Sequence, residues 1–122
     1  MQNSKKEGNK PVGKNILFVC AANINRSPTA EFWFSLRHPV NEYQSAGSSQ
    51  AACRIHGGQY ITQTQMDWAS HIICMDSKNK KQIESAFGSD FSNKIKVVDI
   101  PDEYRFLELS LLLEIMDKIK IQ

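Results

Sequence analysis

Short apolar segments alternate with helix-forming segments along the chain, and this order is what most constrains the fold. The segments expected to form strands are residues 15–19, 43–46, 71–75 and 95–100. The segments expected to form helices are residues 27–37, 59–69, 78–87 and 109–119. Strands joined through helices give right-handed crossovers and a parallel sheet covered by helices. The sequence therefore predicts a single-domain α/β fold, a three-layer sandwich around a four-stranded parallel sheet.

The last helix has the clearest period of the four. Its apolar residues at spacings i, i+3, i+4, i+7 and i+10 are Leu109, Leu112, Leu113, Met116 and Ile119. Such a stripe indicates the face of a helix that packs on the core. Glu114 and Lys118 are four residues apart on the other side, where opposite charges can pair. We therefore expect the apolar stripe to be buried and the Glu114–Lys118 pair to lie on the outer face.

The segment from Cys20 to Ser27 joins the first strand to the first helix. A cysteine and an arginine separated by five residues allow the N–H groups of the loop to converge, which makes a site for an anion. The guanidinium of Arg26 matches two oxygens of a phosphate group. The same positive field favours the thiolate of Cys20, a candidate nucleophile toward phosphorus. Ser27 and Pro28 suit the N-cap and the first position of the following helix.

Displacement at a phosphate monoester requires a nucleophile, donors for the equatorial oxygens and an acid for the leaving oxygen. Cys20 suits the first role, and Arg26 with the loop amides suits the second. Asp99 and Asp102 are both candidates for the acid. Asp102 follows the fourth strand as Cys20 follows the first, and ligands of parallel sheets bind at the carboxyl ends of strands. This pattern predicts an active site at that edge of the sheet.

Several segments in series resemble the low-molecular-weight protein tyrosine phosphatases. The stretches from Ile16 to Cys20 and from Arg26 to Glu31 are similar to the signature of that family. Three later segments resemble further landmarks of the family in the same order: Ser45 to Ser48, Ile72 to Asp76 and Asp99 to Tyr104. The likeness extends from about Asn15 to the C-terminus, and it is closest to a short branch described as predicted tyrosine phosphatases.

This resemblance implies a phosphatase I-like fold and a cysteine-dependent phosphomonoesterase that acts through a phosphocysteine intermediate. It implies Cys20 as nucleophile, Arg26 as phosphate ligand and Asp102 as general acid. Asp102 is preferred to Asp99 because Asp102 and Tyr104 keep the spacing of the family's acid loop. The expected substrate is a phosphorylated protein or a small aryl phosphate, and no cofactor is expected.

Supporting roles follow from the same resemblance. Asn23 is expected to brace the loop, Ser27 to hydrogen-bond the thiolate, and Ser48 to brace the loop from outside. Tyr104 is expected to form an aromatic wall beside the substrate. The residues expected to bind phosphate or substrate are Ala21, Ala22, Asn23, Ile24, Asn25, Arg26, Ser27 and Tyr104.

The sequence also departs from the family's pattern. Asn25 stands where many relatives have a second cysteine that can trap the nucleophile in a disulfide. Ala22 stands where a glycine is common, so a left-handed backbone there would be strained. Residues 48–70 form a much shorter segment than in typical members, and we therefore expect a more open pocket. Cys74 is expected to be structural, on a buried strand, and Cys53 to lie in a loop.

Composition narrows the class of protein further. The 122 residues suffice for one core, and a formal net charge of +2 favours neither nucleic acid nor a membrane surface as partner. Three cysteines do not suit a disulfide framework, the three histidines lack metal-site spacing, and no nucleotide-binding glycine loop is present. Residues 1–14 lack the apolar core of a secretory signal. We therefore expect a disordered tail over residues 1–14, one domain over residues 15–122 and a cytoplasmic location.

Two other functions are compatible with the same motif. Some proteins of this fold reduce arsenate and relay the oxidation through further cysteines, for which this chain offers Cys53 and Cys74. An intact loop would also serve a phosphate-binding module that docks phosphorylated partners with little or no turnover. The leading hypothesis from the sequence is the phosphatase.

Overall fold

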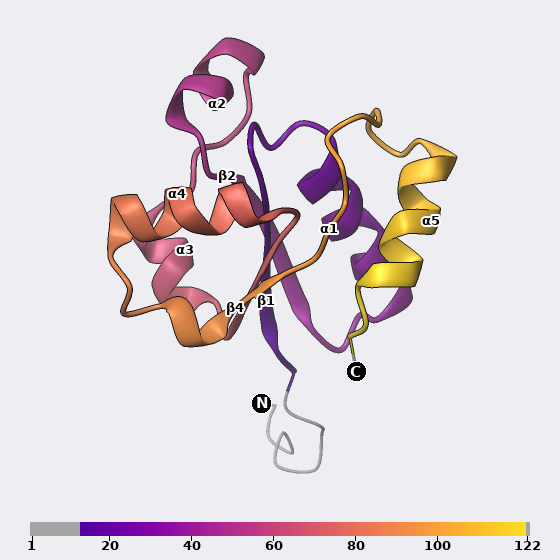
Figure 1. The fold of residues 1–122 in the computed structure, drawn as a ribbon. Coiled ribbons are helices and arrows are strands. Elements are labelled where there is room, and N and C mark those ends of the chain that lie inside the picture. The colour runs from indigo at the N-terminus through magenta and orange to yellow at the C-terminus, as the bar shows by residue number, and fades with distance from the viewer. Residues whose placement is uncertain (1–12, 122) are drawn as a thin grey trace.

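The computed structural model describes residues 13–121, which form a parallel sheet and six helices (Figure 1). In chain order the elements are β1 (Asn15–Cys20), α1 (Arg26–Arg37), β2 (Glu42–Gly47), α2 (Gln50–His56), α3 (Gln63–Trp68), β3 (His71–Cys74), α4 (Ser77–Phe87), the short 3-10 helix η2 (Ser92–Lys94), β4 (Ile95–Val97) and α5 (Leu109–Lys118). The sheet order is β2-β1-β3-β4, and every pair of neighbouring strands is parallel. The predicted α/β class with a four-stranded parallel sheet is confirmed.

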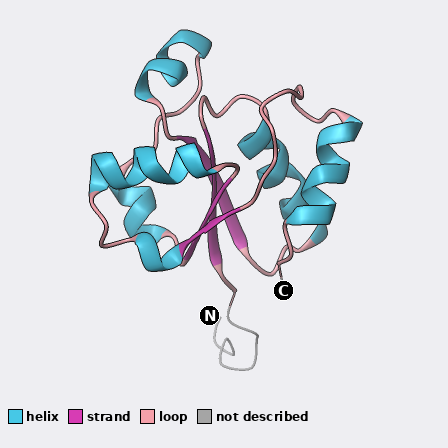
Figure 2. Cartoon of the chain, in the orientation of Figure 1, coloured by secondary structure: helices cyan, strands magenta, loops and turns pink. Residues whose placement is uncertain are grey.

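Helices cover both faces of the sheet and give three layers. α1 and α5 lie on one face, and α3 and α4 lie on the other (Figure 2). Alternate residues of β1 point to opposite faces, so Ile16 and Phe18 join one core cluster while Leu17 and Val19 join the other. All four are at most 1% exposed. Burial on both faces explains why β1 reads as one continuous apolar run.

The region between β2 and β3 differs from the prediction. The helix expected over residues 59–69 is shorter, because α3 begins only after Thr62, whose side chain accepts a hydrogen bond from the N–H of Gln65. A further helix, α2, occupies a stretch that was expected to be a loop. Ser49 caps its first turn, and Gly57 ends it with φ at 81°. Only one residue of α2 is buried, so its sequence shows no amphipathic period.

The buried face of α5 is not the predicted one. The core receives Leu111, Ile115 and Ile119, whereas Leu109, Leu113 and Met116 are 69%, 55% and 46% exposed. The prediction was wrong because the helix begins with an almost continuous apolar run, which supports a stripe on either side. Glu114 and Lys118 do pair, with Lys118 Nζ 2.9 Å from Glu114 Oε1, but both side chains are half-buried and do not lie on the outer face where they were expected.

The first described residues of the chain are hydrogen-bonded to the start of β2 and the residue before it. Of the tail expected over residues 1–14, residues 1–12 lie outside the described part. Lys14 donates its backbone N–H to Asn41 Oδ1 at 2.9 Å, and its carbonyl accepts from the N–H of Glu42. None of the helices in residues 13–121 has the length and apolar character needed to cross a membrane.

Candidate active site

The thiol of Cys20 lies at the carboxyl end of β1, under the first turn of α1. Its Sγ accepts from the backbone N–H of Ser27 at 3.4 Å and lies 3.1 Å from the Ser27 hydroxyl. The backbone N–H of Ser27 thus places one hydrogen-bond donor at the sulfur, and in the second contact either atom can be the donor. Cys20 is 3% exposed, so the sulfur forms the floor of the site.

Ser27 does not cap the helix as the sequence suggested. α1 begins one residue earlier, at Arg26, with Asn25 at the N-cap position and no capping hydrogen bond from its side chain. The hydroxyl of Ser27 is instead fully buried beside the sulfur. The carbonyl of Asn25 accepts from Thr29 Oγ1 at 2.6 Å, which secures the first turn in another way.

Asn23 holds the loop in shape through both ends of its amide. Nδ2 donates to the hydroxyls of Ser27 and Ser45, at 2.9 and 3.0 Å, and Oδ1 accepts from the N–H of Gln59 at 3.2 Å. The backbone of Asn23 is left-handed, with φ at 59°. Asparagine tolerates this conformation better than most residues. The left-handed position therefore falls on Asn23 and not on Ala22.

Arg26 is a buried arginine that joins three segments of the chain. Its Nη1 donates to Asp76 Oδ2 and to the carbonyl of Ile100, both at 2.9 Å. Its Nε lies 3.6 Å from Asp102 Oδ1. Arg26 is only 1% exposed, and within residues 13–121 its buried Nε has no hydrogen-bond partner. The hydrogen bonds found there use Nη1 alone, so Nε is an unused donor on the side of the guanidinium that faces the Asp102 carboxylate.

A cavity of about 160 Å³ opens above the sulfur and brings several predicted residues together. It is lined by Cys20, Ala22, Ile24, Asn25, His56 and Asp102. Asp102 is 62% exposed and lies at the mouth of the cavity with its carboxylate toward Arg26. Asp99 lines a different cavity, together with Asp76, Ile100 and Pro101. Of the two candidate acids, Asp102 therefore lies in the same cavity as Cys20 and Asp99 does not.

Tyr104 is not among the residues that line this cavity. Its hydroxyl donates to Glu114 Oε2 at 3.1 Å, and its ring packs against the core beneath α1 and α5. Partial burial and the hydrogen bond to the Glu114 carboxylate raise the pKa of Tyr104. The structure therefore gives Tyr104 a contact with α5, whereas the sequence suggested a contact with substrate.

Two residues at the site were not singled out by the sequence. His56 lies at the end of α2, the helix that the prediction missed, and no signal in the chain points to it. Asp76 belongs to a stretch that was noted only as a landmark. Its carboxylate caps α4 by accepting from Asn79 N–H and also binds Arg26. The sequence signal that could have indicated Asp76 is an aspartate at the end of a buried strand.

The residues after β2 support the loop from behind. The N–H groups of Ser48 and Ser49 donate to the carbonyls of Cys20 and Ala21, at 2.8 and 3.1 Å. The hydroxyl of Ser48 accepts from Asn79 Nδ2. Ser48 thus reaches the loop through its backbone, while its side chain binds α4.

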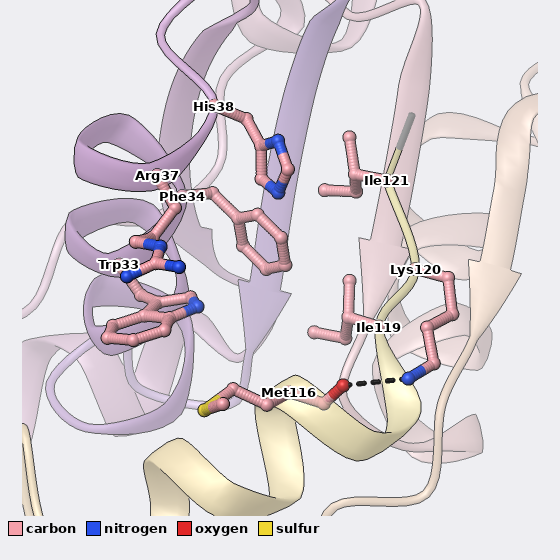
Figure 3. A pocket seen from close by; sticks show the side chains of 8 residues that line it. All are labelled: Trp33, Phe34, Arg37, His38, Met116, Ile119, Lys120 and Ile121. Atoms are coloured by element: carbon pink, nitrogen blue, oxygen red, sulfur yellow. Dashed lines mark hydrogen bonds between the residues drawn. The ribbon is translucent and has the colours of Figure 1, made fainter.

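A larger cavity elsewhere has no comparable chemistry. It measures about 400 Å³, lies between α1 and the end of the chain, and is lined mainly by aromatic and aliphatic side chains with Arg37, His38 and Lys120 at its edges (Figure 3). It contains neither a thiol nor a carboxylate. Within residues 13–121, no group of three or more histidine, cysteine, aspartate or glutamate side chains is arranged to hold a metal ion.

No family model matches the sequence, and no curated protein matches it. A low-molecular-weight protein tyrosine phosphatase from Streptococcus pyogenes is similar in structure, with 26% identity, 69% of this chain and 71% of that chain covered, and a TM-score of 0.58. The chain has the low-molecular-weight tyrosine phosphatase fold.

Two other structures that are similar to this chain differ in the activity or ligand that their names give. Wzb from Vibrio vulnificus, solved in complex with benzylphosphonate, shares 20% identity over 85% of this chain and 90% of that one, with a TM-score of 0.67. The YwlE arginine phosphatase from Geobacillus stearothermophilus shares 23% identity over 80% of each chain, with a TM-score of 0.59. The resemblance expected from the sequence is confirmed, and the expected enzyme class, a phosphatase, agrees with these neighbours.

The third cysteine of this phosphatase fold lies away from the site. Cys74 is 0% exposed and belongs to the core beneath α3 and α4. Burial, reinforced by the negative charge of Asp76, raises the pKa of Cys74 to about 12. We expect iodoacetamide at pH 8 to leave Cys74 unmodified in the folded protein and to alkylate it in urea, because only the thiolate reacts. Mass analysis of tryptic peptide 55–78 measures this, and rapid alkylation without denaturant would contradict it.

Proposed function

We propose that this chain is a cysteine-dependent phosphomonoesterase of the protein tyrosine phosphatase type. One observation carries the proposal: the Cys20 sulfur forms the floor of a cavity that Asp102 also lines, beside a buried Arg26 whose Nε has no hydrogen-bond partner in the described chain. Nucleophile, anion ligand and acid are the three parts that the reaction requires. The phosphatase neighbours support the same conclusion.

The first step transfers the phosphoryl group to sulfur. The Cys20 thiolate attacks phosphorus in line, and the bond between phosphorus and the ester oxygen breaks. Asp102 gives its proton to that leaving oxygen. The loop amides and the free edge of Arg26 hold the other three oxygens as negative charge develops on them. The product alcohol leaves and a phosphocysteine remains.

The second step returns the enzyme to its starting state. Asp102, now a carboxylate, takes a proton from a water molecule as that water attacks the phosphorus. The sulfur–phosphorus bond breaks and inorganic phosphate is released. The hydroxyl of Ser27, 3.1 Å from Sγ, donates a hydrogen bond to the departing thiolate and so stabilises it.

The substrate class that we propose is an aryl phosphate, free or on a protein side chain. The cavity is small, about 160 Å³, and Ile24 gives it one apolar wall that suits a ring. The exposed position of Asp102 leaves the mouth accessible to a group carried by a larger molecule. Because the neighbours include both tyrosine and arginine phosphatases, a phosphorylated arginine is the alternative to test.

The acid is tested by comparing Asp102→Asn with its matched control, Asp99→Asn. We expect Asp102→Asn to lower kcat by roughly 10²–10³-fold, the contribution of a general acid, and Asp99→Asn to change it only slightly. The loss should be larger for phenyl phosphate than for p-nitrophenyl phosphate, because a poor leaving group depends more on protonation. Steady-state rates with both esters measure this. A large loss in Asp99→Asn alone would assign the acid to the other loop.

Hydrolysis, phosphate-ester binding and arsenate reduction together distinguish the phosphatase from the two other functions. Undetectable hydrolysis by the parent protein, together with micromolar binding of phenyl phosphate, would support a binding module. Arsenate reduction that requires Cys53 or Cys74 would support an oxidoreductase. Hydrolysis that needs Cys20 supports the phosphatase.

A further inference from the structure

Cys53 lies directly behind the loop of the site. It is the one buried residue of α2, at 3% exposure, and its Sγ lies 3.7 Å from the carbonyl oxygen of Ala21. A Cβ atom built on Gly47 would come within 2.2 Å of that sulfur. The sulfur of Cys53 therefore occupies the space that a side chain at position 47 would fill.

That space is next to Cys20. Cys20 and Gly47 are register partners on the parallel strands β1 and β2, so their side-chain positions share one face of the sheet. Neighbouring strands are about 4.8 Å apart, and the Cys53 sulfur thus lies about one side chain away from Cys20. Burial raises the pKa of Cys53, and the negative charge of a Cys20 thiolate raises it further, which agrees with this proximity.

No other cysteine has this relation to the nucleophile. Cys74 is the register partner of Val19 and points into the core on the opposite face of the sheet. The loop from Ala21 to Arg26 contains no second cysteine. All three cysteines are free thiols in this structure. Cys53 is thus the only thiol that shares a face of the sheet with Cys20 in the described chain.

We propose that Cys53 is the resolving thiol for Cys20, and that the pair forms a reversible disulfide when a peroxide oxidises the site. In the first step the Cys20 thiolate attacks hydrogen peroxide, which gives a sulfenic acid and hydroxide. In the second step the Cys53 sulfur attacks the Cys20 sulfur, the sulfur–oxygen bond breaks, and water leaves with the proton of the Cys53 thiol. A dithiol reductant restores both thiols. This inference rests on the proposed function, because it needs Cys20 to be a reactive thiolate.

The local structure permits the movement that a disulfide needs. The two sulfurs must approach to about 2.05 Å, so at least one side chain must leave its present rotamer. α2 is a short helix between the cap at Ser49 and the left-handed Gly57, and Cys53 alone anchors it in the core. A small shift of α2 therefore disturbs few contacts. The disulfide would occupy the nucleophile and stop turnover, while it protects Cys20 from sulfinic and sulfonic acids.

Trypsin places the three cysteines on three different peptides, which makes the test direct. Cleavage after lysine and arginine puts Cys20 on residues 15–26, Cys53 on residues 38–54 and Cys74 on residues 55–78. After treatment of the full chain with hydrogen peroxide, we expect peptides 15–26 and 38–54 to be linked, and dithiothreitol to separate them. Cys20 found as a sulfinic acid beside a free Cys53 would overturn the proposal, as would a link to peptide 55–78.

Two variants add a functional readout. Cys53→Ser keeps a donor for the carbonyl of Ala21, and we expect it to hydrolyse p-nitrophenyl phosphate like the parent. After treatment with hydrogen peroxide and then dithiothreitol, the parent should recover most of its starting activity. Cys53→Ser should recover less than a tenth of its own starting activity. Cys74→Ala, the matched control, should recover like the parent. Equal recovery in all three proteins would overturn the role of Cys53.

The two readouts separate this inference from the proposed function. Peptide linkage in the parent protein needs no enzymatic activity and no variant. A linked but hydrolytically inactive protein would refute the phosphatase and leave the disulfide standing. An active protein without the link would do the reverse.

Discussion

We expect replacement of Cys20 by serine to abolish hydrolysis of p-nitrophenyl phosphate, lowering kcat by roughly 10⁵-fold or more. The serine hydroxyl fits the space of the thiol but stays protonated, because the hydrogen bonds from Ser27 cannot ionise so weak an acid. Without an anion at the floor of the cavity no covalent intermediate forms. The expected result is therefore loss of turnover in a protein that still folds.

Binding and a neighbouring cysteine provide the controls for Cys20→Ser. Inorganic phosphate should still bind the variant, since the loop amides and Arg26 are unchanged, and calorimetry measures this directly. Cys53→Ser should retain activity, which shows that the effect belongs to one sulfur and not to thiols in general. Turnover by Cys20→Ser within a hundredfold of the parent would refute the proposed mechanism.

We expect replacement of Arg26 by lysine to lower kcat/KM by about 10³-fold. The guanidinium donates from Nη1 to Asp76 and to the carbonyl of Ile100, and it keeps the Nε edge for the phosphoryl oxygens. A lysine ammonium is one compact charge, so it cannot bind the carboxylate and two oxygens of the transition state in this planar arrangement. We expect a loss in kcat as well as weaker phosphate binding, because the contacts strengthen as charge develops.

Arg37→Lys is the matched control for this second prediction. Arg37 ends the same helix, is exposed, and lies on the rim of the larger cavity. Its substitution should leave kcat/KM unchanged within a factor of two. Initial rates at several substrate concentrations measure both variants, and urea unfolding shows whether Arg26→Lys is folded. A folded Arg26→Lys that keeps more than a tenth of the activity of the parent would contradict the role of the guanidinium.

The order of the elements could be predicted because it depends on local patterns. β1 is buried on both faces and reads as a continuous apolar run, and Gly88 ends α4 as its position suggests. The face of α5 could not be predicted, since four of the five residues from Leu109 to Leu113 are leucines and the period is ambiguous. α2 was missed because a helix with one buried residue has no apolar stripe.

Two sequence patterns predicted parts of the site: the spacing within one loop, and the strand ends that bring Asp102 to the same edge of the sheet as Cys20. Cys20 and Arg26 lie in one loop, and the spacing alone indicated an anion site with a thiol beneath it. The Arg26–Asp76 pair and the partner of Tyr104 depend on which strand ends and helices meet in space. No local sequence pattern predicts these two contacts. The same holds for Cys53, whose position behind the loop follows from the register of β1 with β2.

The hydrogen bond from Arg26 to the carbonyl of Ile100 joins residues that are 74 positions apart, just before the loop that carries Asp102. One side chain therefore joins the loop after β1 to the segment that leads to Asp102, and in the proposed mechanism the same side chain binds the phosphoryl group. In that mechanism, binding of the phosphoryl group to Arg26 acts on both of these segments. In the proposed mechanism, the residue that binds the phosphoryl group therefore also holds the segment that leads to the proposed proton donor, Asp102.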